Sequence, residues 1–214
     1  MERIELKRPY VRVYREGAPS YGGSQMWLER GRDRAAACGL IACADVLAYL
    51  RGETKFDEAD YMAYLRRLRR YFPLIPYRGM DGVTLAVGMS RCLRREQPQL
   101  RAHWCVSGSR FFSRVEEMLR ADIPAVISIG PNMPAFWGRH SVPLYRRDAA
   151  GAYREDTRTH AHYVTVTGLD GEWMRISSWG REYYVSRRQY EKYMRTQSFA
   201  AVTNLLHIEQ RAKQ

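Results

Sequence analysis

Apolar residues recur with a helical period through the first half of the chain. Between residues 36 and 50 they fall three and four positions apart, and Gly52 follows as a stop signal. The same pattern predicts three further helices at residues 57–71, 82–95 and 109–121. The first half of the chain is therefore predicted to be mainly helical.

The second half changes to short runs of alternating apolar residues, which are typical of strands. Residues 131–156 interrupt this pattern, because Pro, Gly and Arg dominate there, and we expect a long irregular loop that contacts substrate. One more helix is predicted at residues 187–195. The predicted strands cover residues 10–14, 100–106, 125–129, 162–167, 173–177, 183–185 and 200–208.

Helices followed by an antiparallel sheet indicate an α+β fold. We expect a single domain over residues 1–214, with a helical part at about 24–121 and a mainly β part at about 122–214. A chain in which 45% of residues are apolar can bury a substantial core. No apolar run is long enough to span a bilayer and residues 1–10 are charged, so we expect no membrane contact and a cytoplasmic location.

The chain has a formal net charge of +12, from 35 Lys and Arg against 23 Asp and Glu. Such an excess attracts acidic partners. The basic runs at residues 66–70, 94–95, 146–147 and 187–188 are scattered, which is typical of solvated faces rather than of one recognition element. We therefore expect a peptide or protein substrate of acidic character, and nucleic acid only as an alternative suggested by charge.

No cofactor and no metal are expected from the motifs present. The chain has no GxGxxG, no phosphate-binding loop and no HExxH, and the HxH pair His160 and His162 has no obvious third ligand. The four cysteines show no CxxC spacing and lie in apolar or helical contexts, which predicts reduced thiols. They are Cys38, Cys43, Cys92 and Cys105.

Cys38 stands at the start of the first predicted helix, followed by Gly39. Free N–H groups and the positive end of the helix dipole favour thiolate there, so Cys38 is a candidate nucleophile, whereas Cys43 is expected to be a core residue. A thiol nucleophile also needs a base, and His162 opens the alternating segment at 162–167. His160 is its main rival; His103, His140 and His207 have no comparable setting.

Three blocks carry a family resemblance: residues 37–42 (ACGLIA), 162–168 (HYVTVTG) and 176–180 (ISSWG). Together they resemble the papain-like cysteine peptidase superfamily, and are most similar to compact bacterial peptidases that process bacteriocin leaders. The order also agrees, since His162 lies 124 residues after Cys38 and Ser177 another 15 beyond. This resemblance implies a papain-like fold with Cys38 as nucleophile and His162 as base.

The resemblance implies further roles. The family usually has Asn or Asp at the position of Ser177 to orient the histidine, and a serine hydroxyl is shorter and uncharged, so orientation would be weaker. Gln25, 13 residues before Cys38, would complete an oxyanion hole with the Cys38 amide. Trp179 would shield the histidine from water, and Trp179 and Gly39 would contact substrate.

The leading functional hypothesis is a cysteine peptidase-like thiol hydrolase that cleaves peptide or amide bonds through an acyl-enzyme. The same machinery can transfer an acyl group to an amine or deamidate glutamine, and the residues do not separate these outcomes. The alternative from another class is a binding protein that keeps the papain-like fold with weak or no catalysis, which the serine at position 177 would explain.

Overall fold

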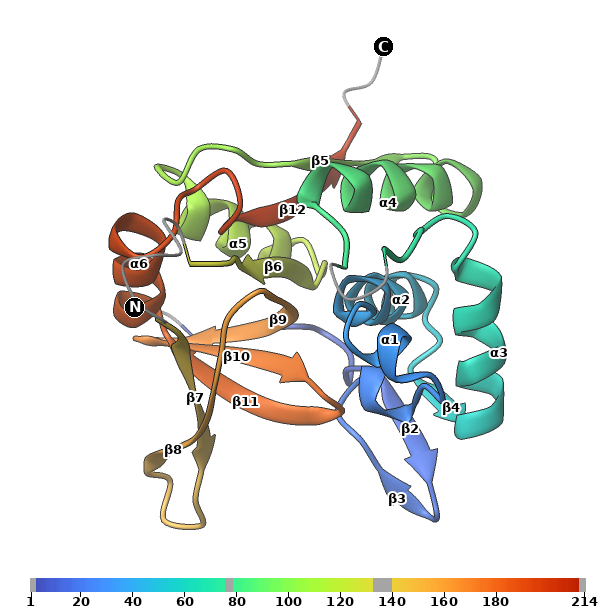
Figure 1. Ribbon diagram of the computed structural model, residues 1–214, viewed down its shortest axis with the longest axis horizontal. Helices are drawn as coiled ribbons and strands as arrows, with labels where there is room; N and C mark the ends of the chain where they lie inside the picture. The colour runs from blue at the N-terminus through green and yellow to red at the C-terminus, as the bar shows by residue number, and fades with distance from the viewer. Residues whose placement is uncertain (1–2, 76–78, 133–139, 212–214) are drawn as a thin grey trace.

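The computed structural model describes residues 3–75, 79–132 and 140–211 (Figure 1). The longer helices lie mainly in the first half of the chain, and the second half is rich in strands. The elements in chain order are β1 (Ile4–Glu5), β2 (Arg12–Arg15), β3 (Ala18–Pro19), the 3-10 turn η1 (Gln25–Trp27), α1 (Gly31–Arg34), α2 (Cys38–Leu50), β4 (Lys55–Asp57), α3 (Glu58–Leu68), α4 (Gly82–Glu96), β5 (Leu100–Trp104), α5 (Phe111–Arg120), β6 (Ala125–Ile129), β7 (Val142–Arg147), β8 (Tyr153–Thr159), β9 (His162–Asp170), β10 (Trp173–Ser178), β11 (Arg181–Ser186), α6 (Arg187–Thr196) and β12 (Leu205–Gln210).

A nine-stranded sheet forms the centre of the fold. Its strands lie in the order β5-β12-β6-β9-β10-β11-β7-β8, with β1 paired to β9, and the described pairings are antiparallel. A small second sheet joins β3, β2 and β4 beside α3. The α+β fold class expected from the sequence is confirmed.

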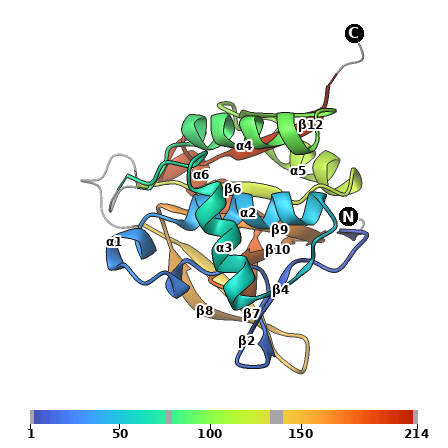
Figure 2. The same cartoon turned by 90° about the vertical axis from the view of Figure 1, so that its right-hand side faces the viewer.

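Helix α2 is the buried element against which the others pack. It contacts β9 and β6 of the sheet and the helices α3 and α4, and it is buried from Cys38 through Tyr49 (Figures 1 and 2). Gly52 ends it in the left-handed conformation, with φ +81°, as the predicted stop signal requires. Among the described helices, none is both long and apolar enough to cross a membrane.

The helix predictions hold to within a few residues. The stretches expected at 57–71, 82–95, 109–121 and 187–195 become α3, α4, α5 and α6. Asp81 caps α4, because its carboxylate accepts a hydrogen bond from the Thr84 backbone N–H at 2.9 Å. These helices are amphipathic, so the periodic signal reports their buried faces directly.

Two predictions are wrong. Residues 142–156 are not an irregular loop: β7 and β8 form an antiparallel hairpin, whose turn is closed by the Asp148 carboxylate and by Gly151 at φ +83°. Arg and acidic side chains line the exposed parts of this hairpin, so it carries little apolar alternation to detect. Residues 133–139 of the predicted loop lie outside the described residues. The strand expected at 200–208 begins only at Leu205, because a turn hydrogen-bonded to the Phe199 carbonyl precedes it.

Gly88, in the middle of α4, gives a test of this packing. Gly→Ala normally stabilises a helix by about 1 kcal/mol. A Cβ at position 88, however, would lie 2.5 Å from the Tyr71 carbonyl oxygen and 2.7 Å from the Phe72 ring. We expect Gly88→Ala to lower the free energy of unfolding in urea by about 1–3 kcal/mol. Gly31→Ala in α1 is the control, since its nearest neighbour is 3.7 Å away and its stability should stay near wild type. A Gly88→Ala protein with the same free energy of unfolding as wild type would contradict this packing.

Candidate active site

Cys38 and His162 come together because α2 packs along β9. Cys38 is the first residue of α2 and His162 the first of β9, and both side chains line the same two hollows. The first turn of α2 has no side-chain cap, so its leading N–H groups remain available. His160, the rival base, is exposed, whereas His162 is buried.

Ser178 and Trp179 hold the His162 ring. The ring Nε2 lies 2.8 Å from the Ser178 hydroxyl oxygen. The Trp179 indole stacks on the imidazole, with ring centroids 4.6 Å apart and planes inclined by 18°. Trp179 thus covers the imidazole from one face, and the Ser178 hydroxyl occupies Nε2.

Ser177 does not take the orienting role expected of it. Its hydroxyl donates to the Tyr21 carbonyl oxygen at 2.8 Å. Ser177 and Ser178 both line the small hollow with His162, but the hydroxyl beside the imidazole nitrogen is that of Ser178. The orienting contact to the His162 ring thus comes from the residue after Ser177 in the chain, Ser178.

Gln25 lines the same small hollow as Cys38. Its side-chain amide donates one hydrogen bond to the Arg34 carbonyl at 2.8 Å, and a second N–H remains on that nitrogen. The residues between Gln25 and Cys38 form an ordered segment and not a projecting loop. They fold into α1, and the Arg34 guanidinium closes the turn on the Leu28 carbonyl.

Gly39 is placed differently from the expected substrate contact. It is buried, and a Cβ there would lie 2.9 Å from Leu85, 3.2 Å from Tyr163 and 3.3 Å from Met80. Gly39 is needed for close packing of α2 against its neighbours. Trp179 lines the small hollow beside His162 and also a shallow hollow near Trp27.

Asp45 is a buried carboxylate on α2 that holds neighbouring segments of the site together by hydrogen bonds. It lies two turns after Cys38 on α2 and accepts hydrogen bonds from the Tyr61 hydroxyl at 2.6 Å, the Gly23 N–H at 2.9 Å and the Tyr10 hydroxyl at 3.3 Å. Gly23 stands two residues before Gln25. Asp45 therefore ties the segment that carries Gln25 to the helix that carries Cys38.

Burial governs the ionisation of the site. It raises the pKa of Cys38, an effect that the backbone amides of Tyr163 and Gly39 partly offset. Burial also lowers the pKa of His162 to about 4. The two groups thus rest as thiol and neutral imidazole at neutral pH, rather than as the ion pair that the helix dipole alone would favour.

Two hollows that share Cys38, His162 and Tyr163 differ in size and character. The smaller, about 10 Å³, lies between Gln25, Cys38, His162 and Trp179, and this is close to the least volume that holds one water molecule. The larger, about 680 Å³, also reaches Cys38 and His162. Its wall is largely apolar and includes Met80, Val83, Trp104, Val106, Pro131 and Val202.

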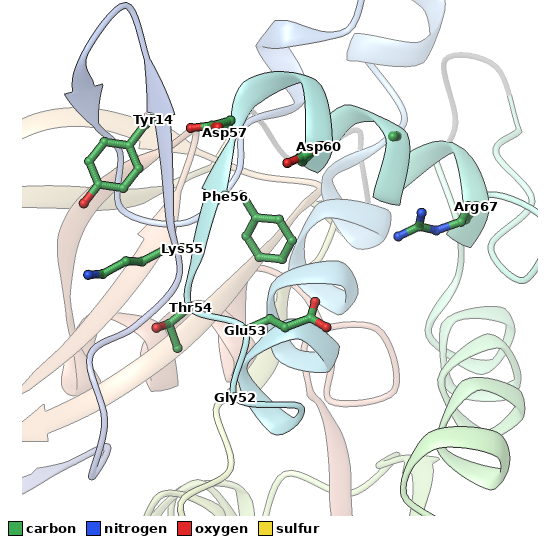
Figure 3. A pocket seen from close by; sticks show the side chains of 10 residues that line it. Tyr14, Gly52, Glu53, Thr54, Lys55, Phe56, Asp57, Asp60 and Arg67 are labelled. Atoms are coloured by element: carbon green, nitrogen blue, oxygen red, sulfur yellow. The ribbon is translucent and has the colours of Figure 1, made fainter.

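Another hollow of about 710 Å³ lies away from this pair, between β2, β4 and α3 (Figure 3). Charged side chains of both signs surround it, among them Lys55, Asp57, Asp60 and Arg67. Its described lining contains no cysteine, histidine or serine. We therefore assign the candidate active site to the larger hollow beside Cys38 and His162, hereafter the groove.

The fold matches that of a crystal structure from Bacillus anthracis described as a "putative C39-like peptidase". The match has a TM-score of 0.51 and 15% sequence identity, and it covers 100% of both chains. The papain-like fold expected from the sequence is thus confirmed. No protein-family model and no curated protein matches the sequence.

Sequence reasoning missed two residues of the site. Asp45 had a signal, since it is a charged residue inside an otherwise apolar stretch of helix, and a buried carboxylate needs partners. Ser178 had a weaker one. Only the strand geometry shows which of two adjacent serines faces the histidine.

Asp45 should leave a signature in the pH dependence of stability. Burial raises its pKa from 3.8 to about 6, so between these values the folded protein binds more protons than the unfolded chain. Protonation of Asp45 therefore adds at most about 3 kcal/mol to the free energy of unfolding. This contribution is fully present below pH 3.8 and is lost as the pH rises through 6. Urea unfolding from pH 4 to 7.5 should show wild type losing stability relative to Asp45→Asn. The exposed-residue control Asp170→Asn should follow wild type, and parallel curves for wild type and Asp45→Asn would refute the assignment.

Proposed function

We propose that this protein is a cysteine peptidase-like thiol hydrolase that cleaves peptide or amide bonds through an acyl-enzyme. The observation that carries the proposal is that Cys38 and His162, from the starts of α2 and β9, line one groove. The similarity in fold to a protein described as a C39-like peptidase supports the same chemistry.

The reaction begins when the Cys38 sulfur attacks the carbonyl carbon and its proton passes to Nδ1 of His162. Because both groups rest neutral, the proton moves during the attack rather than before it. The tetrahedral intermediate then collapses, and the C–N bond breaks as the imidazolium gives its proton to the departing amine. Water, deprotonated by the same imidazole, hydrolyses the thioester and regenerates the thiol.

Negative charge on the carbonyl oxygen needs donors beside Cys38. The Cys38 backbone N–H, at the uncapped start of α2, supplies one of them. The second N–H of the Gln25 side-chain amide supplies the other, because Gln25 borders the small hollow next to Cys38. A hollow that holds about one water also suits a single carbonyl oxygen.

The groove favours an apolar peptide segment over the acidic one expected from net charge. Its described lining includes Asp81 but neither Lys nor Arg. Val83 and Val106 are 61% and 67% exposed there, and Trp104 forms part of the wall. Excess positive charge therefore lies elsewhere on the surface, and an extended peptide with apolar side chains fits the walls next to Cys38.

Replacement of Cys38 tests the catalytic role. A mixture of peptides with varied apolar residues is incubated with wild type, Cys38→Ala and Cys43→Ala, and new amino termini are read by mass spectrometry. We expect Cys38→Ala to lose at least about a thousandfold in rate, since the attacking atom is gone. Cys43→Ala, a second cysteine on the same helix, should cleave at a rate close to wild type.

A reactivity measurement accompanies the assay and needs no knowledge of the substrate. Iodoacetamide should label Cys38 faster in wild type than in His162→Ala, because the imidazole takes the thiol proton. The same labelling should be unaffected in His160→Ala. Equal rates in wild type and His162→Ala, together with unchanged cleavage by Cys38→Ala, would overturn the proposal and leave a binding role for this fold. If amine acceptors gave acylated products instead, the reaction would be acyl transfer.

The two adjacent serines form a matched pair of variants. Ser178→Ala removes the hydroxyl at Nε2 of His162, so we expect kcat to fall by about five- to tenfold with little change in KM. Ser177→Ala removes a hydroxyl bonded to the Tyr21 carbonyl and should alter stability more than kcat. The pKa of His162, measured by NMR, should move only in Ser178→Ala. The opposite result would restore Ser177 as the orienting residue.

A further inference from the structure

Two histidines and a cysteine meet at the β5–β12 end of the sheet, outside the candidate active site. One possible ligand atom from each of His103, Cys105 and His207 lies within 4.8 Å of the other two. The rings of His103 and His207 are 5.0 Å apart, edge to face. Of the groups of His, Cys, Asp and Glu among the described residues, this is the one with ligand atoms so placed.

Strand pairing builds the cluster. His207 of β12 lies directly opposite His103 of β5. Cys105 follows two residues after His103, and the ladder continues through its N–H, which donates to the Leu205 carbonyl at 3.1 Å. Residues two apart on a strand share a face. All three side chains therefore project from the same side of the sheet, next to α5.

His207 carries an unsatisfied polar atom. The residue is 7% exposed, and its Nδ1 is buried without a hydrogen-bond partner. The nearest carboxylate oxygen, from Glu209, is 3.9 Å away. A buried imidazole nitrogen without a partner costs free energy, which a ligand for that ring would offset.

We propose that His103, Cys105 and His207 bind a zinc ion. Two imidazoles and a thiolate are the donor types that Zn²⁺ prefers, in tetrahedral geometry. Zn–N bonds of 2.0–2.1 Å and a Zn–S bond of 2.3 Å place ligand atoms about 3.4–3.6 Å apart. The three side chains need to close by roughly 1 Å from their present separation, which small rotations of the side chains provide. A water molecule completes the coordination.

Two charged neighbours tune this site. The Arg114 guanidinium of α5 donates to the Cys105 sulfur at 2.9 Å, which partly offsets the rise in the pKa of Cys105 caused by burial. The Glu209 carboxylate lies 3.7 Å from Nδ1 of His103, where it can accept a proton from that ring and orient it, which leaves Nδ1 of His207 for the metal. Glu209 also balances the charge of Arg101 at 2.9 Å.

A bound ion would link β5 and β12, two strands that are paired in the sheet but far apart in the sequence. Trp104, between His103 and Cys105, faces the other side of the strand and forms part of the groove wall at Cys38. The proposed zinc ion therefore lies on the opposite side of this strand from the groove, where it supports the groove wall and takes no part in the chemistry at Cys38. It stands independently of the proposed hydrolase function.

The experiment uses Cys38→Ser protein, because a thiol and imidazole at the active site could also hold zinc. After EDTA treatment and desalting, Zn²⁺ affinity is measured by competition with a chromogenic chelator, and Co²⁺ is added separately as a spectroscopic probe. We expect one Zn²⁺ per chain, and a thiolate-to-cobalt absorption band. Adding Cys105→Ser or His207→Gln should weaken binding at least tenfold and remove or alter this band.

The controls exclude general effects of mutation. Cys92→Ser and His160→Gln, placed outside the cluster, should bind Zn²⁺ as tightly as their Cys38→Ser parent. Zn²⁺ should raise the urea midpoint of the parent and of these controls but not that of the cluster variants, so a variant that folds poorly is still informative. Absence of stoichiometric binding, or equal binding by parent and cluster variants, would overturn the proposal.

Discussion

Helix α2 is enclosed by sheet and helices along nearly its whole length, and this burial determines where the candidate chemistry lies. A helix that is apolar on all sides must be surrounded, so β9, β6, α3 and α4 all pack against it. Its first residue is then brought beside the first residue of β9. Cys38 and His162, distant in the chain, become neighbours because of core packing and not because of a local motif.

The same burial determines the polar interactions beneath the site. Asp45 cannot remain in an apolar helix without partners, so two tyrosines and a glycine N–H converge on it. The glycine lies in the segment that leads to Gln25, which α1 braces through the Arg34 carbonyl. One buried carboxylate thus connects helix α2, the segment that leads to Gln25 and helix α3, which carries Tyr61.

Burial patterns explain which features the sequence could predict. Helices α3, α4, α5 and α6 were found because each presents one buried face, and β9 because it alternates. The β7–β8 hairpin was missed because much of it is exposed and charged, so it has little periodic apolar signal. The identity of Cys38 and His162 came from family resemblance, whereas Ser178 and Asp45 required knowledge of side-chain direction and packing. His103, Cys105 and His207 become a cluster only once β5 and β12 are paired.

Net charge describes the surface as a whole and not the lining of one hollow. The chain carries a formal charge of +12, yet the described groove beside Cys38 contains no Lys or Arg. Basic residues lie largely on exposed helix faces and on the hairpin, where screening by salt limits their reach to about 10 Å. The lining of the groove is instead largely apolar and includes Val83, Trp104 and Val106. The proposal of an apolar peptide substrate rests on this local lining, whereas the net charge bears on the long-range attraction of acidic partners.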